Sequence, residues 1–249
     1  MLALAFVLGA VGSAKAQDDF KGFYAGANGG GAFGNFNVQV TPVFSPTGYF
    51  ATTSTPAIAA ASSQTISPNG FTFGGQAGYN HQWDNFVLGL EADFGTMSLS
   101  GSTSATAVYP CCAPTAFTVA QTAETSWLFT LRPRAGFVVH HTFFYSTVGA
   151  AFTSVKYTGL FTDTFATAHE SASLQETRPG WIAGGGAEAR ISHHWSVKGE
   201  YLYAGFGTAS VPSANLTAFT PPIPFPSNLF THTVSLQTKI ARGGINYRF

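Results

Sequence analysis

Apolar residues in this chain come in short alternating runs rather than in long continuous ones. Beyond residue 16, no stretch approaches the roughly 18 consecutive apolar residues that a membrane-spanning helix needs. Strict alternation of apolar and polar residues, bounded by turn residues, indicates β-strands with one apolar face. We therefore expect strands at about 21–35, 70–82, 86–99, 124–139, 143–157, 174–190, 195–206 and 233–249.

The connections between these segments alternate between short and long. Three are tight, at 83–85, 140–142 and 191–194. Four are long and rich in Ser, Thr, Ala and Pro, at 36–69, 100–123, 158–173 and 207–232. This asymmetry is typical of barrels with short periplasmic turns and long external loops. The predicted fold is all-β: an eight-stranded antiparallel up-and-down transmembrane β-barrel, monomeric, with both termini in the periplasm.

The composition supports a surface that is largely hidden from water. Only 9% of the residues are charged, against roughly 25% in soluble domains. In lipid, only helices and closed barrels satisfy every backbone polar group, so a membrane location requires a barrel here. The 11 basic residues balance the 11 acidic ones. Nucleic-acid binding is not expected, because it needs a concentrated basic surface.

The first residues resemble an export signal. Leu2 to Gly12 form an apolar core, and Ala14-Lys15-Ala16 has the small-x-small form of a signal-peptidase site. No Lys or Arg precedes the apolar run, which points to a start codon assigned too late. We expect a cleaved signal peptide at 1–16, a barrel domain at 17–249, and export to the bacterial outer membrane.

Charged residues share one strand face and aromatic or aliphatic residues the other. In the segment 86–94, for example, Leu88 and Leu90 lie opposite Glu91 and Asp93. The inward-facing charges are then Glu91, Asp93, Glu124, Arg132, Arg134, Glu176, Arg178, Glu188, Arg190, Lys198, Glu200, Arg242 and Arg248. Side chains fill the interior of an eight-stranded barrel, and unpaired buried charges are costly. We favour a salt-bridged plug, with a narrow gated pore as the alternative.

Two segments fit the alternation less well. The fifth mixes both faces, so that Lys156 fits inside only at the outer rim. The eighth begins with Val234, Leu236 and Ile240 on one parity and ends with Ile245 and Tyr247 on the other. A β-bulge near residues 242–244 is the expected reconciliation.

Several motifs carry a family resemblance. They are Gly78-Tyr79-Asn80, Val87-Leu88-Gly89-Leu90-Glu91-Ala92-Asp93-Phe94, Arg132-Pro133-Arg134-Ala135-Gly136-Phe137, Tyr145-Ser146-Thr147-Val148-Gly149-Ala150-Ala151, Gly184-Gly185-Gly186-Ala187-Glu188, Trp195-Ser196-Val197-Lys198-Gly199-Glu200-Tyr201-Leu202-Tyr203 and Gly244-Ile245-Asn246-Tyr247-Arg248-Phe249. Together they resemble the small outer-membrane surface antigens of alphaproteobacteria, within the outer membrane protein A-like and opacity-like group. The resemblance implies an eight-stranded outer-membrane barrel. It also implies insertion by the barrel-assembly machinery, which reads a terminal aromatic, here Phe249.

Aromatic residues are expected at the membrane boundaries. Trp and Tyr favour the interface because an apolar ring and a polar tip are both satisfied there. The predicted interface aromatics are Trp83, Trp127, Trp195, Tyr201 and Tyr247. The expected partners of the barrel are outer-membrane lipid and lipopolysaccharide, with no nucleic acid.

No set of residues predicts catalysis, a metal or a cofactor. His81, His140, His141, His193 and His194 fall at the short turns, where polar side chains suit a headgroup boundary as well as a metal would. Ser126 and Ser146 have no His at their depth, and His169 and His232 lie in expected loops without a clear partner. Adjacent Cys111 and Cys112 can form a vicinal disulfide that stiffens a loop tip.

The expected function is therefore structural. We predict a non-enzymatic outer-membrane barrel and surface antigen with a salt-bridged, largely closed lumen and four long external loops. Two alternatives stay open. A small-solute porin would conduct through a narrow pore, and a loop-mediated adhesin would bind its partner through the external loops.

Overall fold

The computed structural model describes residues 20–249, so the expected signal peptide lies outside the described residues. Within them, the long strands are β1 (Gly22–Pro42), β3 (Asn69–Trp83), β4 (Phe86–Val108), β5 (Ala116–Val139), β6 (Thr142–Asp163), β7 (His169–Arg190), β8 (Trp195–Ser213) and β11 (Phe230–Arg248). The connections contain α1 (Ser54–Ser62), β2 (Gln64–Ile66), β9 (Thr217–Ala218) and β10 (Ile223–Pro224). No helix in this part of the chain is long and apolar enough to cross a membrane.

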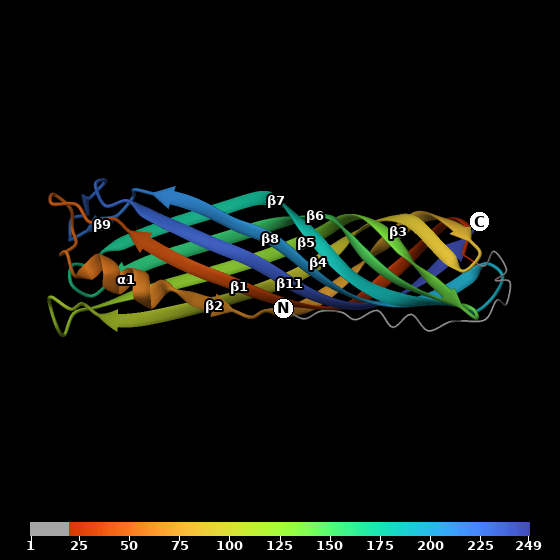
Figure 1. The fold of residues 1–249 in the computed structure, drawn as a ribbon. Helices are drawn as coiled ribbons and strands as arrows, with labels where there is room; N and C mark the ends of the chain where they lie inside the picture. The colour runs from red at the N-terminus through yellow and green to blue at the C-terminus, as the bar shows by residue number, and fades with distance from the viewer. Residues whose placement is uncertain (1–19) are drawn as a thin grey trace.

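The long strands close into a ring (Figure 1). Each pairs antiparallel with its neighbour along the chain, and β11 pairs with both β8 and β1. The paired residues can be traced from strand to strand around the ring, starting at Phe71 of β3 and moving first to β1. The circuit ends at His81, which lies ten residues farther along β3 than its starting point. A stagger of this kind is what tilts the strands against the axis of a closed barrel.

The expected all-β antiparallel barrel is confirmed, but the strand count differs. The sheet of residues 20–249 holds eleven strands instead of eight, because β2, β9 and β10 form within the connections. The long strands also run well past their expected ends, so that only 109–115 and 164–168 connect β4 to β5 and β6 to β7. Residues 98–108 illustrate the cause: small inward residues alternate with outward Ser and Thr, a composition that resembles a loop.

The tight connections lie where they were expected. Asp84–Asn85 joins β3 to β4, His140–His141 joins β5 to β6, and 191–194 joins β7 to β8. Asp84 and His140 have positive φ angles of 49° and 58°, the backbone that two-residue hairpins favour. We call the half of the barrel next to these turns the turn half, and the opposite half the loop half.

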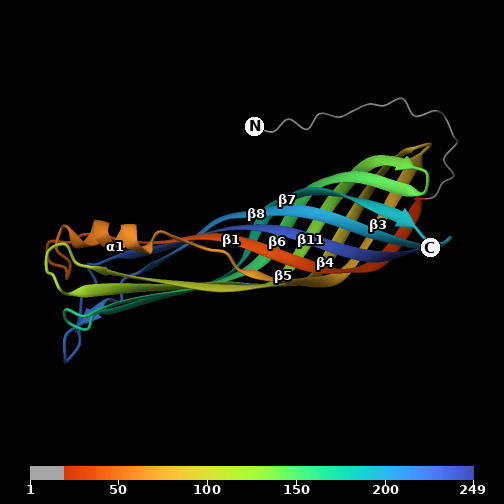
Figure 2. The same ribbon diagram turned by 90° about the horizontal axis from the view of Figure 1, so that it is seen from below.

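In the loop half the ring opens into two layers (Figure 2). The β7–β8 pairing ends at Trp181–Gly205, and β3 begins at Asn69 opposite Phe33 of β1. Beyond these points β8, β11, β1 and β2 form one layer, and β4 to β7 form the other. The helix α1 packs against β1, β4 and β5 at one of the two seams.

At the second seam, between β7 and β8, side chains bond to backbone groups that are not paired between the two strands. The Asn215 amide accepts from the Ser171 backbone N–H at 3.2 Å and donates to its carbonyl at 2.8 Å. Arg178 donates to the Thr208 carbonyl at 2.6 Å. Pro179 and Pro212, which have no N–H, stand on the two strands that border the seam.

The two faces of each strand exchange character between the halves. In the turn half the outward face of β5 carries Trp127, Phe129 and Leu131, whereas in the loop half it carries Thr118 and Thr122. The inward face changes in the opposite sense. Its turn-half residues are Arg132 and Arg134, and its loop-half residues are Phe117 and Val119, all four buried.

This exchange corrects the expected bulge at residues 242–244. The β1–β11 register is continuous from Arg248 to Phe230, so Ile240 faces the interior and Ile245 the exterior without any shift. The apolar residues of β11 move from even to odd positions because the apolar surroundings move from the inside of the barrel to the outside. The register of β11 shifts instead against its other neighbour, β8, between Ser235 and Gln237, where Gly207 of β8 has a positive φ angle.

A second correction concerns Glu124, which was expected to face the lumen. It lies on the outside of β5, with its carboxylate 3.7 Å from the ammonium of Lys156, and both side chains are exposed. The register of β5 with β6 shifts between Glu124 and Leu128, so the parity of the turn half does not extend to Glu124.

We predict that Gly207→Ala destabilises the barrel by about 1–2 kcal/mol, because its φ of 67° lies in the left-handed region that a Cβ disfavours. Space is no obstacle, since the nearest atom to an added Cβ is 3.7 Å away. Urea midpoints in detergent micelles measure the loss. Gly199→Ala on the same strand is the matched control, because an added Cβ meets nothing within 4 Å. Equal urea midpoints for the two variants would contradict the left-handed backbone conformation of Gly207 at the bulge.

Candidate functional site: the lumen

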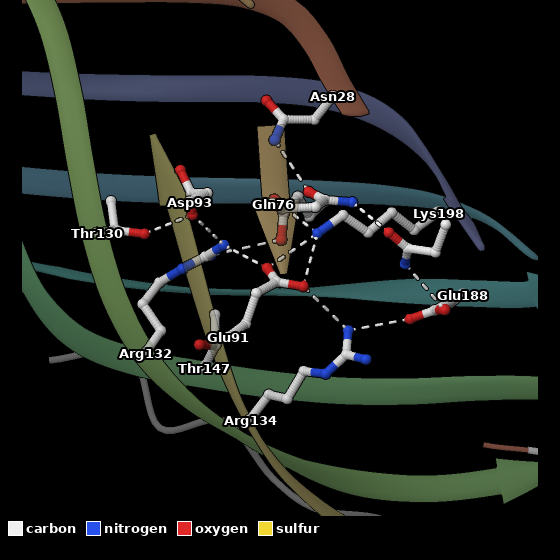
Figure 3. A network of polar contacts seen from close by, with 12 residues as sticks. Asn28, Gln76, Glu91, Asp93, Thr130, Arg132, Arg134, Thr147, Glu188 and Lys198 are labelled. Atoms are coloured by element: carbon white, nitrogen blue, oxygen red, sulfur yellow. Dashed lines mark hydrogen bonds and ion pairs between the residues drawn. The ribbon is translucent and has the colours of Figure 1, made fainter. Parts of the chain in front are cut away.

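The lumen of the turn half holds a continuous network of ion pairs (Figure 3). Glu91 of β4 lies at its centre. Its carboxylate accepts from Arg132 at 2.7 Å, from Lys198 at 2.9 Å and from Arg134 at 3.3 Å. The phenol of Tyr24 donates a fourth hydrogen bond at 2.8 Å. One carboxylate thus joins bases that project from β5 and β8.

Asp93 and Glu200 extend the network across the barrel. Asp93 accepts from Arg132 at 2.9 Å and from Arg242 at 3.1 Å. Glu200 accepts from Arg242 at 2.5 Å and lies 3.5 Å from Lys198. Each of these side chains is at most 3% exposed. The dielectric is low at such depth, so only mutual pairing makes the charges tolerable.

Glu188 of β7 continues the network toward the turns. It accepts from Arg134 at 2.9 Å, from the Ser196 hydroxyl at 2.5 Å and from the Asn246 amide at 3.0 Å. The guanidinium of Arg248 lies 3.6 Å from the same carboxylate. Four acids and four bases (Glu91, Asp93, Glu188, Glu200, Arg132, Arg134, Lys198 and Arg242) therefore form one connected cluster, which Arg248 joins at its turn-side edge.

Arg178 and Arg190, also expected in the lumen pairs, lie outside this cluster. Arg178 pairs with Glu176 of its own strand at 3.2 Å, in the loop half. Arg190 lies at the turns and donates to the backbone carbonyls of Ser192 and His193.

Neutral side chains also belong to the network. Gln76 accepts from Asn28 at 2.9 Å and donates to Asn246 at 2.6 Å, and Tyr145 donates to Glu200 at 3.1 Å. Each of them occupies one of the alternate positions that face the interior on its strand, which is β1, β3, β6 or β11. Parity was the available signal for Asn28, Tyr145 and Asn246, which sequence reasoning did not single out as lumen residues.

Apolar layers enclose the ionic cluster at both ends. Toward the turns, Phe20, Val87, Val138 and Phe143 pack together, each at most 3% exposed. Away from the turns, a larger core begins in the closed ring and continues between the two layers. It comprises Ala32, Phe36, Val38, Ile66, Met97, Leu99, Ala123, Leu128, Ala151, Val155, Tyr157, Ile182, Leu202, Ala204, Phe206, Ala209, Val234, Leu236 and Ile240.

A second buried polar group lies farther out and corrects the expectation that His232 has no clear partner. His232 lies 3.0 Å from Glu170 through Nε2 and 3.2 Å from Tyr157 through Nδ1, and all three are at most 1% exposed. The Ser213 hydroxyl donates to Glu170 and not to the imidazole. A Ser-His-Glu triad would need a hydrogen bond from the hydroxyl to the imidazole.

The outer tips of the strands close over an aromatic cap. Tyr49 and Tyr109 donate to the same carboxylate oxygen of Asp163, at 2.5 Å and 3.0 Å. Burial raises the pKa of both phenols well above 10, and the negative charge of Asp163 raises it further. Cys111 and Cys112 form a disulfide in the short β4–β5 connection nearby.

The expected interface aromatics all lie on the outward face. Trp83, Trp195 and Tyr247 stand next to the turns, and Trp127 stands at the other edge of the apolar surface. Tyr201 lies between these two levels. Phe249 is 78% exposed, and its backbone N–H donates to the carbonyl of Phe23.

Comparison with known proteins identifies the family. The model of the family described as outer membrane protein beta-barrel domain matches residues 2–249. The chain belongs to this family. The 31 kDa outer-membrane immunogenic protein of Brucella melitensis biotype 1 is 32% identical over 186 residues, 74% of this chain and 68% of that protein. Its namesake from Brucella suis biovar 1 matches to the same extent. The expected membership of an outer-membrane barrel family of surface antigens is confirmed.

Solved structures are similar only at a distance. The outer membrane protease OmpT from Escherichia coli has a TM-score of 0.44 and 9% identity, covering 91% of this chain and 96% of that chain. Neisserial surface protein A has a TM-score of 0.34 and 10% identity, covering 92% and 98%. At these scores the likenesses add nothing to the assignment.

We predict that Arg132→Ala lowers the free energy of unfolding by about 3–5 kcal/mol, because Glu91, Asp93 and Glu200 lose a shared partner while staying buried. Urea titration in micelles measures the loss. Lys156→Ala is the control. It removes an exposed ion pair and costs at most about 1 kcal/mol. Comparable losses in the two variants would show that the buried network contributes little.

We predict that Asp163→Asn lets Tyr49 and Tyr109 ionise at lower pH, because the amide keeps an acceptor oxygen but removes the negative charge. The protonated phenols favour the folded cap up to their raised pKa, so the cap weakens as the pH rises above about 10. Tyrosinate absorbance at pH 11 should exceed that of the wild type. Asp84→Asn, at the opposite end, should leave the titration unchanged. Superimposable curves for Asp163→Asn and wild type would refute this role of the charge.

Proposed function

We propose that the chain is a structural outer-membrane barrel and surface antigen whose lumen is closed. The observation that carries this proposal is the layered interior. A cluster of paired acids and bases lies between two apolar layers, and the outer layer is the larger. An ion crossing the barrel would have to break the network and then enter a packed hydrocarbon core.

The outer surface supports the orientation in the membrane. The outward face of the turn half is apolar, with Phe71 and Phe73 at 77% and 68% exposure. The outward face of the loop half is polar, as in Ser98, Ser100 and Ser102 of β4. In our proposal the turn half spans the bilayer, the loop half projects from the cell surface, and the turns face the periplasm.

The partners follow from this orientation. Outer-membrane lipid covers the apolar face of the turn half, and lipopolysaccharide surrounds the base of the loop half. We propose that the barrel-assembly machinery recognises the exposed Phe249. The chain is proposed to act as a monomer and to have no enzymatic activity. The hydroxyl of the half-buried Ser213 donates to Glu170 and not to His232, which supports the second part of the proposal.

We predict that the refolded chain, residues 17–249, is electrically silent in planar bilayers. Arg132→Ala should also be silent, because the apolar core of the loop half still blocks the path. Single-channel recording, after heat-modifiable gel migration has shown folding, makes the test. Discrete conductance steps that change with Arg132→Ala would support the porin alternative and overturn the closed lumen.

A further inference from the structure

The outward face of the β8–β11–β1 layer carries two adjoining hollows just beyond the apolar surface. The first, of about 390 Å³, is lined by Asn37, Gln39, Thr65, Thr208, Thr233 and Ser235, among others. The second, of about 560 Å³, is lined by Phe33, Asn35, Asn69, Tyr203, Gln237 and Lys239, among others. Both run over β1, β11 and β8 and reach the segment 63–69. We call them together the outer groove.

The strand register arranges these side chains in rows. Thr65, Asn37, Ser235 and Thr208 are successive partners on β2, β1, β11 and β8. Adjacent strands lie about 4.8 Å apart, and residues of the same face repeat about every 6.7 Å along a strand. The Thr65 hydroxyl donates to the side-chain amide oxygen of Asn37 at 2.8 Å. This bond orients the amide and leaves its nitrogen to donate. The sheet therefore presents a regular grid of hydroxyls and amides.

The chemistry of the groove selects for a neutral, hydroxyl-rich ligand. No charged side chain lines the first hollow, and Lys239 is the one charge among the described residues of the second. Hydroxyls and amides both donate and accept, as a polyol requires. At the inner end, Phe33 is 47% exposed and Tyr203 lies two strands away in the same row. Such rings pack against the apolar C–H faces of a sugar.

We propose that the outer groove binds the neutral saccharide chain of an outer-leaflet glycolipid. The inner end meets the aromatic surface that acyl chains would cover, so a sugar attached to such a lipid reaches the groove directly. This inference rests on the proposed orientation of the barrel in the membrane. It does not depend on whether the lumen is closed.

The test uses the full refolded chain in micelles free of lipopolysaccharide. The probe is the oligosaccharide released from lipopolysaccharide by mild acid and then dephosphorylated, with binding followed by saturation-transfer NMR and calorimetry. We expect the double variant Asn37→Val, Ser235→Val to bind about tenfold or more weakly, because two hydrogen-bonding groups are lost. Thr208→Val tests the same row with a single change.

The control is Thr122→Val with Ser173→Val. These outward residues of the other layer occupy a similar row across β5, β6 and β7. It should bind like the wild type. The proposal would be overturned if the wild type failed to bind the probe, or if the control variant lost as much affinity as the groove variant. Displacement of the probe by lipid A or by inorganic phosphate would do so too, because it would indicate recognition of phosphate. Conductance of the wild type would count against the closed lumen only.

Discussion

A β-strand presents alternate side chains to opposite faces, and in this barrel the surroundings of the two faces exchange partway along the strands. In the turn half the interior is ionic and the exterior apolar, and in the loop half the interior is mostly apolar and the exterior mostly polar. The exchange occurs within continuous strands such as β11, without a change of parity. The ionic lumen, the hydrocarbon core of the two layers and the outer groove all depend on that single constraint.

Burying eight charges is tolerable only because each has partners from several strands. Arg132 bridges Glu91, Asp93 and Glu200, so no charge is left isolated when one contact lengthens. A network of this kind defines the register across β4, β5, β8 and β11, because a slip by one residue would send the charges to the outer face. The apolar core of the loop half can then pack on strands that are already aligned.

Much of the turn half could be predicted from the sequence. Glu91, Asp93, Arg132 and Arg134 alternate with aromatic or aliphatic neighbours, and this contrast reveals both the strands and their inward face. The loop half was largely missed. Its outward Ser and Thr alternate with inward Ala, Gly and a few larger apolar residues, which reads as loop composition. The partner of His232 could not be predicted, because Glu170 is 62 residues away along the chain and its strand was expected to begin only at residue 174.

The seam between β7 and β8 has a consequence for crowded membranes. Open sheet edges normally invite a strand from another molecule. Here Pro179 and Pro212 remove donors from the two bordering strands, and Asn215 and Arg178 occupy backbone groups of Ser171 and Thr208. A neighbouring copy therefore finds an interrupted row of hydrogen-bonding groups. The barrel can split into two layers in its loop half and still resist joining its neighbours into fibrils.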